Sequence, residues 1–589
     1  PSGRPVETRR PGQAWQQAPG VRTEYTFNRT SGLYACRNLD ISGDTVRAHG
    51  FHKAGILSVT RTTDEDGESV IVFADFLGRR RLSRLVTASG QTRDTYYVYD
   101  DYGFLRAALS PAASSQLSSG TVLRLSDPSL LASCHLYEYD YRGNLNKVSV
   151  PGGGSTVLAS TPTGKPVLSQ DLIQARGRIM SYQTYDRQGR PAYRGTMHVA
   201  SGEPVAAMAG MWRTSFTGEA DNTIFGYSIV RSWQTQQDCL AADFYDDYSF
   251  LSLFPELSAS LAYGAVSGCG GKGDSLKSRG KPTGAVRRVI APDGKSRLIV
   301  SVFYYDSSGR LIQTRTANHL GGSDLCALSL SFDGRPMRVF TRHESPDTTL
   351  SVEREYSYDC NLMPVSERIR INGGQWTALT QNSYDAMGRL CRSVLLDGML
   401  PIDYAYTPQG ALRSIASGPF CQTLYRETRP DGTKGYLAGQ ISGQAFSLYT
   451  ATSPYLASLR EGVEACYSYT YDGGRLTDAR YTETARVVRS LGSPGMTAPD
   501  VHRSPDFSAS YAYDACGNVT SVKRHGLLDK RSGPAAGALG ARAMNYYYGL
   551  LDDLTLQYQG NRLVKVTDAV EDPDYAEAND FADGEDKAG

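Results

Sequence analysis

A short motif that recurs along the chain constrains its fold more than any other feature. In each good copy a tyrosine precedes an aspartate, and a glycine follows, usually with Arg or Asn and an apolar residue behind it. The residues that define these copies are Tyr99, Asp100, Gly103, Tyr139, Asp140, Gly143, Tyr185, Asp186, Gly189, Arg190, Tyr305, Asp306, Gly309, Arg310, Tyr384, Asp385, Gly388, Arg389, Tyr471, Asp472, Arg475, Tyr513, Asp514 and Gly517. Recurrence at so many places indicates a structural repeat, because a catalytic site would not be copied along a whole chain.

The copy at residues 301–316 shows what one motif folds into. Residues 301–305 place side chains alternately on two faces, as a strand requires. The Asp306 carboxylate can accept a backbone N–H two residues on, and Gly309 falls where a bulged turn needs a left-handed residue. The tyrosine before the aspartate and the apolar Leu311 then close the hairpin end from both strands. The motif therefore predicts a β-hairpin with a bulged turn.

The aspartate and arginine of a motif can also pair, within one repeat or between two. An exposed pair of this kind contributes only ~0–1 kcal/mol, so the turn geometry matters more. The alternative, that these pairs bind a ligand, is disfavoured by their repetition.

The spacing of the copies divides the chain. A further turn signal, Pro292-Asp293-Gly294, makes residues 286–317 a continuous run of strands and turns. The long gap between Tyr185 and Tyr305 breaks the rhythm and contains Trp212 and Trp233. We expect a ragged N-terminal segment (1–20), YD-repeat hairpins (21–198), a loop-rich insert with an aromatic cluster and some short helix (199–285), further hairpins (286–570) and an acidic, disordered tail (571–589).

Composition narrows the classes of partner. The chain has 62 Lys and Arg against 61 Asp and Glu, which gives no overall reason to expect nucleic acid. No stretch approaches the ~18 apolar residues of a membrane helix. The 10 cysteines have irregular spacing without C-x-x-C, which favours single thiols, with one or two disulfides remaining an alternative if the chain is exported.

Several candidate sites are weak. Residues 268–273 match G-x-G-x-x-G, but no strand precedes them and no helix follows, so we expect a flexible loop. Asp243, Asp246 and Asp247, or the acidic tail, could hold Ca²⁺, although solvated hairpin residues are the simpler interpretation. Neither His319 nor His343 has a Cys or His at metal spacing. We therefore expect no catalytic residues, no cofactor and no metal.

Aromatic clusters prompt a second hypothesis. The chain holds 38 tyrosines, including Tyr96, Tyr97 and Tyr99 and the run 546–548. Such rings can stack on sugars if they are exposed, or pack as the core of a two-faced sheet.

The tyrosine-aspartate copies resemble the YD repeats of the RHS family over roughly residues 70–570. Residues 244–248 and 318–322 also resemble long RHS proteins of Bacteroides-like bacteria. The resemblance implies an all-β fold in which hairpins join into one long antiparallel sheet that spirals into a hollow shell, here a partial one. In this family the shell encloses a C-terminal toxic domain or serves in cell–cell adhesion. The family's closing core, with its autoproteolytic aspartates, has no match before Gly589, so that activity is not carried over.

These observations lead to one main hypothesis and two alternatives. We expect a non-catalytic shell segment, secreted or on a bacterial cell surface, whose partner is its own C-terminal effector domain. The first alternative is an adhesion or glycan-binding scaffold, whose partner is a surface glycan or cell-wall polymer. A weaker alternative is a hidden glycan-processing enzyme.

Overall fold

The structure is a computed structural model that describes residues 4–11, 18–198, 212–290, 295–418, 420–451, 459–490, 505–532 and 544–570. Several sequence predictions lie outside these residues. They are the acidic tail 571–589, the Pro292–Gly294 turn, and parts of the N-terminal segment and of the insert. In the 546–548 tyrosine run, the backbone is described but the first two side chains are not.

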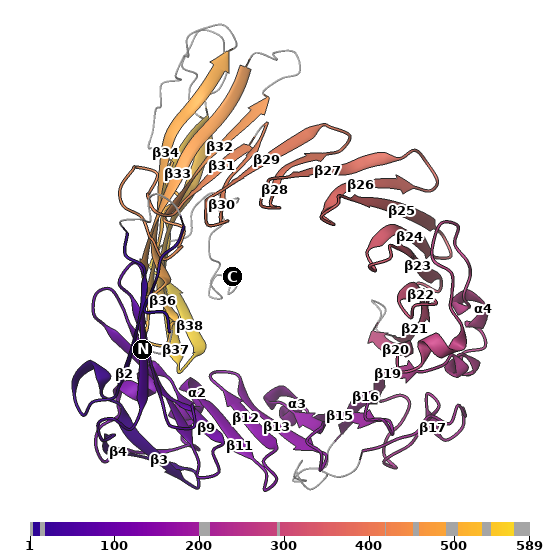
Figure 1. The fold of residues 1–589 in the computed structure, drawn as a ribbon, viewed down its shortest axis with the longest axis horizontal. Coiled ribbons are helices and arrows are strands. Elements are labelled where there is room, and N and C mark those ends of the chain that lie inside the picture. The colour runs from indigo at the N-terminus through magenta and orange to yellow at the C-terminus, as the bar shows by residue number, and fades with distance from the viewer. Residues whose placement is uncertain are drawn as a thin grey trace. The chain divides into compact units, whose positions relative to one another are not determined.

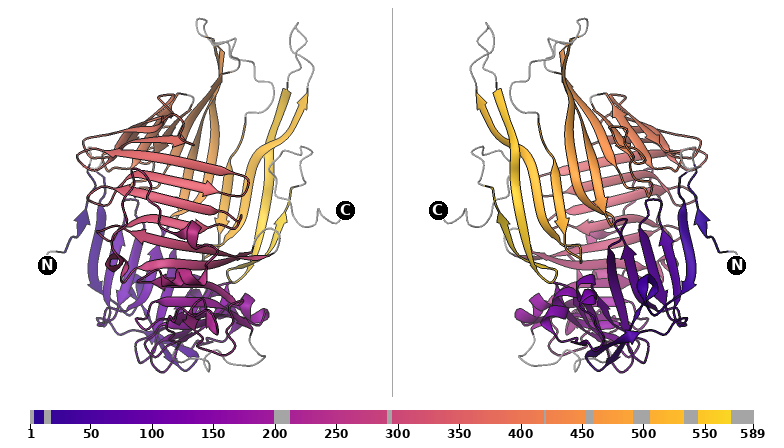
Figure 2. Two further views of the ribbon diagram at one scale, coloured as in Figure 1. Left: turned by 90° about the vertical axis from the view of Figure 1, so that its right-hand side faces the viewer. Right: turned by 90° about the vertical axis from the view of Figure 1, so that its left-hand side faces the viewer.

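The described residues form an all-β protein with little helix, which confirms the predicted fold class. One antiparallel sheet holds 33 of its strands, and strands that are neighbours in this sheet are mostly neighbours in the chain (Figure 1). Figure 2 shows the magenta-to-salmon strands of residues 282–395 following one another as successive rungs. Adjacent hairpins thus extend one sheet, as the repeat predicts.

The bounds of the elements are as follows. The sheet begins with β1 (Glu7–Thr8), β2 (Val21–Phe27), β5 (Ser58–Thr63), β6 (Ser69–Ala74), β7 (Arg80–Val86), β8 (Thr92–Tyr99), β9 (Leu105–Leu109), β11 (His135–Tyr139), β12 (Leu145–Val150), β13 (Gly154–Ser160), β14 (Pro166–Gln170), β15 (Ile179–Tyr185), β16 (Pro191–His198) and β19 (Cys239–Tyr245). It continues with β20 (Pro282–Ile290), β21 (Ser296–Tyr305), β22 (Leu311–Ala317), β23 (Ser323–Leu330), β24 (Pro336–Glu344), β25 (Thr349–Tyr358), β26 (Pro364–Ile371), β27 (Thr377–Tyr384) and β28 (Leu390–Leu395). It ends with β29 (Leu400–Tyr406), β30 (Leu412–Ser417), β31 (Phe420–Tyr425), β32 (Gly443–Ala451), β33 (Leu459–Asp472), β34 (Arg475–Ser490), β35 (Ala509–Tyr513), β36 (Val519–Ser532), β37 (Met544–Gln559) and β38 (Arg562–Asp568).

Two small sheets and a few short helices complete the fold. The small sheets are β3 (Arg37–Ser42), β4 (Thr45–Phe51) and β10 (Val122–Arg124), and β17 (Thr223–Ile224) with β18 (Tyr227–Ser228). The helices are α1 (Pro111–Ser115), α2 (Pro128–Ser133), α3 (Leu172–Arg176) and α4 (Ser258–Leu261), and the 3-10 turns are η2 (Gly32–Tyr34), η4 (Ser249–Leu253) and η5 (Ser275–Ser278). No helix in the described part of the chain is both long and apolar enough to cross a membrane.

The motif hairpins have the predicted bulged turn. In the copy at Tyr305 the strand register shifts between Tyr304 and Tyr305, so that Tyr305 lies opposite Leu311. Gly309 has φ +74°, in the left-handed region that favours glycine. The same shift places Tyr185 opposite Pro191 and Tyr384 opposite Leu390. The tyrosine and the residue after the motif cation therefore close each hairpin end, as expected.

The chain divides into two compact units. Unit 1 comprises Pro1–Tyr137, Ser149–Gly154 and Ile402–Gly589, and unit 2 comprises Glu138–Val148 and Ser155–Pro401.

Each unit has one apolar core, where a second layer covers the sheet. In unit 1 the small sheet β3–β4–β10 packs on β5–β9, which buries Val46, Phe73, Leu82 and Val98. In unit 2 residues 212–238 and 246–281, on either side of β19, pack on β15, β16 and β19–β21, and Trp212 is fully buried there. Apolar burial of this kind is the main favourable term in folding.

Beyond these cores, part of the sheet in unit 2 is held by cross-strand ion pairs. Glu353 on β25 pairs with Arg338 on β24 and with Arg370 on β26, the latter at 2.7 Å. The hydrogen bond from Arg370, together with Arg338, outweighs desolvation and lowers the pKa of Glu353. Opposite charges on neighbouring strands add to the stability of the sheet here.

In unit 1, the start and the end of the sheet lie against each other (Figure 1). Arg93 on β8 pairs with Asp472 at 2.8 Å, and Glu68 accepts the Gly473 N–H at 2.8 Å. Asp66, in the β5–β6 turn, accepts the backbone N–H groups of Leu437 and Ala438 at 3.0 and 2.8 Å. These contacts use side chains and turns. We call this set of contacts the seam.

The left-handed glycine of the motif gives a first prediction. Gly388 has φ +76°, and a Cβ added there would meet nothing within 4 Å. Gly388→Ala should therefore cost backbone strain alone, about 1–2 kcal/mol of the free energy of unfolding. Urea unfolding followed by tryptophan fluorescence measures this cost. Gly271→Ala is the control, since its Cβ would also meet nothing within 4 Å but its backbone is not left-handed. Equal effects of both substitutions would contradict the assignment.

The seam gives a second prediction. Asp66→Ala removes the acceptor of two backbone N–H groups, so the amides of Leu437 and Ala438 should exchange with deuterium at least about tenfold faster. Hydrogen exchange with mass spectrometry on the full chain measures this. Asp101→Ala, at an exposed turn position, should leave the exchange of that peptide unchanged. Unchanged exchange in Asp66→Ala would show that the seam is not held through this carboxylate.

Candidate functional site

Most of the motif aspartates perform the same local task. Asp306 accepts the backbone N–H groups of Ser308 at 2.9 Å and Arg310 at 2.8 Å. The carboxylates of Asp100, Asp140, Asp186, Asp385 and Asp514 each accept two backbone N–H groups of their own turns. The carboxylates are therefore used to fix the turn.

The copy at Tyr471 departs from this pattern. Asp472 lies directly opposite Arg475, so the turn contains only Gly473 and Gly474, with φ +57° and +74°. Two consecutive glycines allow this tight two-residue turn, in which both residues are left-handed. The Asp472 carboxylate is then available to Arg93 in the seam. The sequence analysis grouped this copy with the others, because its tyrosine, aspartate, glycine and arginine follow one another at almost the same spacing.

Arg190, Arg310 and Arg389 each bind the aspartate of their own turn, and several turn cations also bind the next turn. Arg310 donates to Asp306 at 2.8 Å and reaches forward to the carbonyl of Ser331 at 2.6 Å. Lys165 donates to the Gly189 carbonyl at 2.5 Å, and Arg475 to the Asp514 carbonyl at 2.8 Å. The predicted pairing within a repeat therefore occurs, and so does a forward bond to the following hairpin.

The motif tyrosine completes this arrangement by pointing backward. Its hydroxyl donates to the carbonyl of the first residue after the preceding turn, which follows a Lys or Arg in every pair except that of Tyr384, where Met363 stands before Pro364. The pairs are Tyr185 with Pro166, Tyr305 with Pro282, Tyr358 with Pro336, Tyr384 with Pro364, and Tyr513 with Leu476. The preceding cation lies over the ring in several copies, as Lys281 does over Tyr305 at 5.1 Å. We call the forward cation bond and the backward tyrosine bond together the turn clamp.

Sequence reasoning missed the backward bond of the turn clamp. The signal was present: proline follows the turn cation at Lys165, Arg190, Lys281 and Arg335. Proline has no backbone N–H to donate to a neighbouring strand, but its carbonyl can still accept the tyrosine hydroxyl.

Sequence reasoning also missed a split copy of the motif inside the long gap. Tyr245 donates to the Pro191 carbonyl at 3.0 Å, as other motif tyrosines do. Asp246 donates its N–H to the Lys281 carbonyl and accepts the Gly280 N–H at 2.7 Å. Gly280 has φ +79°, and Lys281 reaches forward to the Gly309 carbonyl. The motif is thus divided, and residues 247–279 are inserted into its turn.

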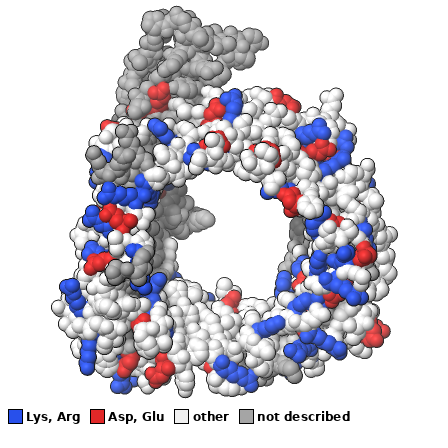
Figure 3. Space-filling model, viewed as in Figure 1, with Lys and Arg blue, Asp and Glu red and all other residues white. Residues whose placement is uncertain are grey.

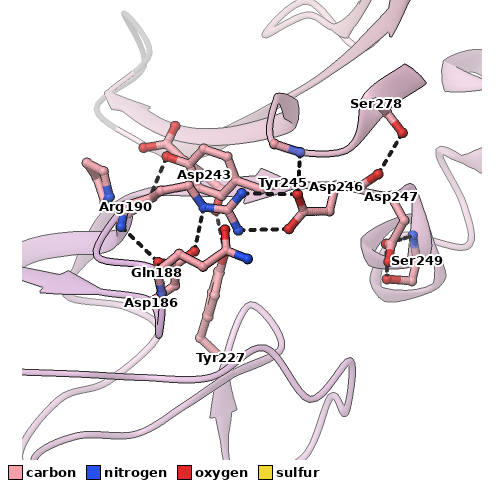
Figure 4. Close-up of polar contacts among 12 residues, drawn as sticks. Asp186, Gln188, Arg190, Tyr227, Asp243, Tyr245, Asp246, Asp247, Ser249 and Ser278 are labelled. Atoms are coloured by element: carbon pink, nitrogen blue, oxygen red, sulfur yellow. Dashed lines mark hydrogen bonds and ion pairs between the residues drawn. The ribbon is translucent and has the colours of Figure 1, made fainter. Parts of the chain in front are cut away.

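A pocket of about 460 Å³ opens in unit 2 where the turn Asp186–Arg190 meets this split motif. Figure 4 shows Arg190 between the carboxylates of Asp186 and Asp246. Its guanidinium donates to Asp186 at 2.7 Å and to both oxygens of Asp246 at 3.1 and 2.8 Å. These hydrogen bonds, that of Asp246 foremost, raise the pKa of Arg190, and Arg190 lowers the pKa of Asp246.

The other wall of the pocket is aromatic. Phe244 stacks on Phe250 with ring centroids 4.3 Å apart, and Phe216 meets Tyr227 and Phe244 edge-on at 5.3 and 5.8 Å. Phe244, Phe250 and Tyr227 are buried, whereas Phe216 is half-buried. Phe216 therefore supplies accessible aromatic surface backed by a rigid cluster.

The three aspartates considered as a calcium site have separate partners. Asp243 pairs with Arg287, Asp246 with Arg190, and Asp247 accepts from the N–H of Ser249 at 2.9 Å. No group of three or more potential metal ligands gathers among the described residues. These carboxylates serve ion pairs and turns.

The other candidates are also part of the fold. The glycine-rich loop 268–273 is held, since Gly270 donates to the Leu328 carbonyl and Gly273 to that of Tyr305, and only the 3-10 turn η5 follows it. This loop was expected to be flexible. His343 pairs with Asp324 on the neighbouring strand. Tyr96 is buried at the core of unit 1. All 10 cysteines lie in the described residues and none is in a disulfide.

The charges of the surface are mixed. On the face drawn in Figure 3, Lys and Arg side chains alternate with Asp and Glu side chains. The charged groups therefore form no single-sign surface on that face.

The fold places the chain among antiparallel hairpin-repeat proteins. No family model and no curated protein matches it. Among solved structures it is similar to the crystal structure of TcdB2-TccC3, with 12% identity and a TM-score of 0.41 over 87% of this chain. It is also similar to that of TcdB2-TccC3-TEV, with 11% identity and a TM-score of 0.44 over 91% of this chain. The chain spans 27% and 28% of the length of these two proteins.

The motif carboxylates give a pH prediction. Desolvation raises the pKa of Asp306, but hydrogen bonds from the backbone and side chain of Arg310 outweigh it and hold the pKa below 3.8. A lowered pKa in the folded state adds stability above the unfolded value, and this stability is lost as the pH falls through the folded value. The urea midpoint of the wild type should thus fall steeply below about pH 4.

Asp306→Asn removes this titration and should make the midpoint fall less between pH 7 and pH 3 than it does in the wild type, while lowering the midpoint at pH 7. The measurement is urea unfolding at pH 7, 4 and 3. Asp347→Asn, at an exposed position, is the control and should keep the wild-type pH dependence. An Asp306→Asn curve parallel to the wild-type curve would contradict the role given to Asp306.

Proposed function

We propose that the chain is a non-catalytic shell segment of the RHS type, in a secreted or cell-surface bacterial protein, that encloses or presents an effector domain C-terminal to the repeats. The observation that carries this proposal is the turn clamp. At the Tyr305 copy it joins the hairpin to the one before and to the one after, and single bonds of the same kind recur at other copies, so the sheet is suited to continuous extension. Repeat proteins of this kind use extended surfaces formed by many units.

The seam supports the proposal independently. A sheet made by adding hairpins has an exposed edge at each end, and such edges attract other strands. In unit 1, polar contacts join β8 and the β5–β6 turn, near the start of the sheet, to the end of β33 and to the loop before β32. A wall that encloses a cargo needs its ends to be restrained in this way.

The motif carboxylates also fit a structural role. A general acid or base needs a carboxyl group whose pKa is shifted toward neutrality. Asp246, Asp306 and Asp385 have lowered pKa values, because arginine and backbone N–H groups stabilise their charged forms. Such groups favour scaffolding over proton transfer.

Limited proteolysis of the native gene product tests the proposal. We expect any segment C-terminal to the repeats to resist trypsin in the native protein, and to be cut rapidly once the wild-type shell is partly unfolded in urea. Asp66→Ala in the seam should increase cleavage of that segment, whereas Asp101→Ala should not. A C-terminal domain cut freely in the native state, or a gene product without one, would refute enclosure.

A second candidate function is an adhesion or glycan-binding scaffold. The pocket beside Arg190 favours it, because the pocket combines an aromatic wall with fixed polar groups. This candidate does not require an enclosed domain, so it is tested separately, by measuring the binding of sugars to the pocket.

A further inference from the structure

The pocket beside Arg190 has the size and the rigidity of a binding site. Its volume of about 460 Å³ lies within the ~300–1,000 Å³ of small-molecule sites. The aromatic wall is fixed, since the Phe216 ring lies against Gly226, where even an added Cβ would come within 2.6 Å of it. Arg190 is held by two carboxylates and lies over the Tyr245 ring at 4.2 Å. A ligand would meet a prearranged aromatic wall and a fixed Arg190 guanidinium, so little ordering of these groups would oppose binding.

The backbone at the pocket is strained on the polar side. Asp246 has φ +74°, an uncommon conformation for a residue other than glycine. Hydrogen bonds from Gly280 and Arg190 and the ion pair with Arg190 hold it there. Strained residues of this kind cluster at ligand sites.

Some polar side chains that line the pocket are not used by the fold in the described part of the chain. Gln188 and Arg187 are the exposed central residues of the Asp186–Gly189 turn, and among the described residues no hydrogen bond is formed by their side chains. Asp247 uses one carboxylate oxygen to cap Ser249, which leaves the other oxygen as an acceptor. The pocket therefore offers planar donors and acceptors next to an aromatic face.

The balance of charge selects the class of ligand. Asp186, Asp246 and Asp247 stand against Arg187 and Arg190, and Arg190 is already paired with two of these carboxylates. A strong anion would meet carboxylates, and a cation would meet the guanidinium groups. An uncharged ring with many hydroxyl groups satisfies both donors and acceptors, while its C–H face packs on phenylalanine.

We propose that the pocket lined by Phe216, Arg187, Gln188 and Asp247 binds a neutral sugar ring. Phe216 stacks on the ring, and Gln188, Arg187 and Asp247 bond its hydroxyl groups. The inference deepens the glycan-binding candidate and does not rest on enclosure. Enclosure is tested by proteolysis and sugar binding by titration, so the failure of one leaves the other standing.

Titration calorimetry of the full chain tests this inference. The probes are chitohexaose, cellohexaose, maltohexaose and mannohexaose, each up to millimolar concentration, with polygalacturonate as the anionic comparison. We expect at least one neutral hexasaccharide to bind, and polygalacturonate not to compete. Binding of none of the four, or of polygalacturonate alone, would overturn the proposal.

Matched variants locate the binding. Phe216→Ala and Gln188→Ala should each weaken binding about tenfold or more. Phe332→Ala removes a fully exposed ring at another motif turn, and Asn361→Ala changes the residue that corresponds to Gln188 in the Asp359 turn. Both controls should bind as the wild type does.

Gln188 is exposed, so its substitution tests the site even if Phe216→Ala disturbs the insert, which far-ultraviolet circular dichroism would report. Binding that survives Gln188→Ala and a folded Phe216→Ala would place the sugar elsewhere and overturn the assignment.

Discussion

The structure depends on the bond that one turn makes to the next. A hairpin alone is marginally stable, and its sheet edges remain unpaired. The turn clamp adds polar contacts at the hairpin ends, where the cation reaches forward and the tyrosine hydroxyl reaches back. Each hydrogen bond contributes only about 0.5–1.5 kcal/mol, but the clamp recurs at successive hairpins. The clamp sets the spacing between neighbouring turns, and backbone hydrogen bonds between the strands hold the sheet together.

Apolar cores and cross-strand ion pairs stabilise different parts of the sheet. Where a second layer covers the strands, as around Trp212 or Phe73, apolar burial provides most of the stability. Outside these two apolar cores, as around Glu353, cross-strand ion pairs join neighbouring strands. The two arginines offset the cost of burying the Glu353 carboxylate, because they pair with its charge and donate hydrogen bonds to it.

The pocket exists because the repeat is interrupted. In an ordinary copy the motif cation donates to carbonyls of the next turn, as Arg310 does. At Arg190 the next turn is opened by the 247–279 insertion, and the Asp246 side chain takes the place of those carbonyls. The aromatic residues of the insert fold back against this widened turn. A structural repeat and a candidate binding site are thus built from the same motif.

The sequence alone determined the hairpin, its bulged turn and the all-β class, because alternation, an aspartate and a left-handed glycine are local signals. It did not reveal that Tyr245, Asp246, Gly280 and Lys281 form one motif, since residues 34 apart in the chain meet only through folding. Nor could it separate the tight turn at Asp472 from the others, or show that Asp472 pairs with Arg93 across the seam. Contacts between distant segments depend on sheet register and on what the insert covers. Only the tertiary structure decides these, and with them whether Phe216 and Gln188 face one pocket.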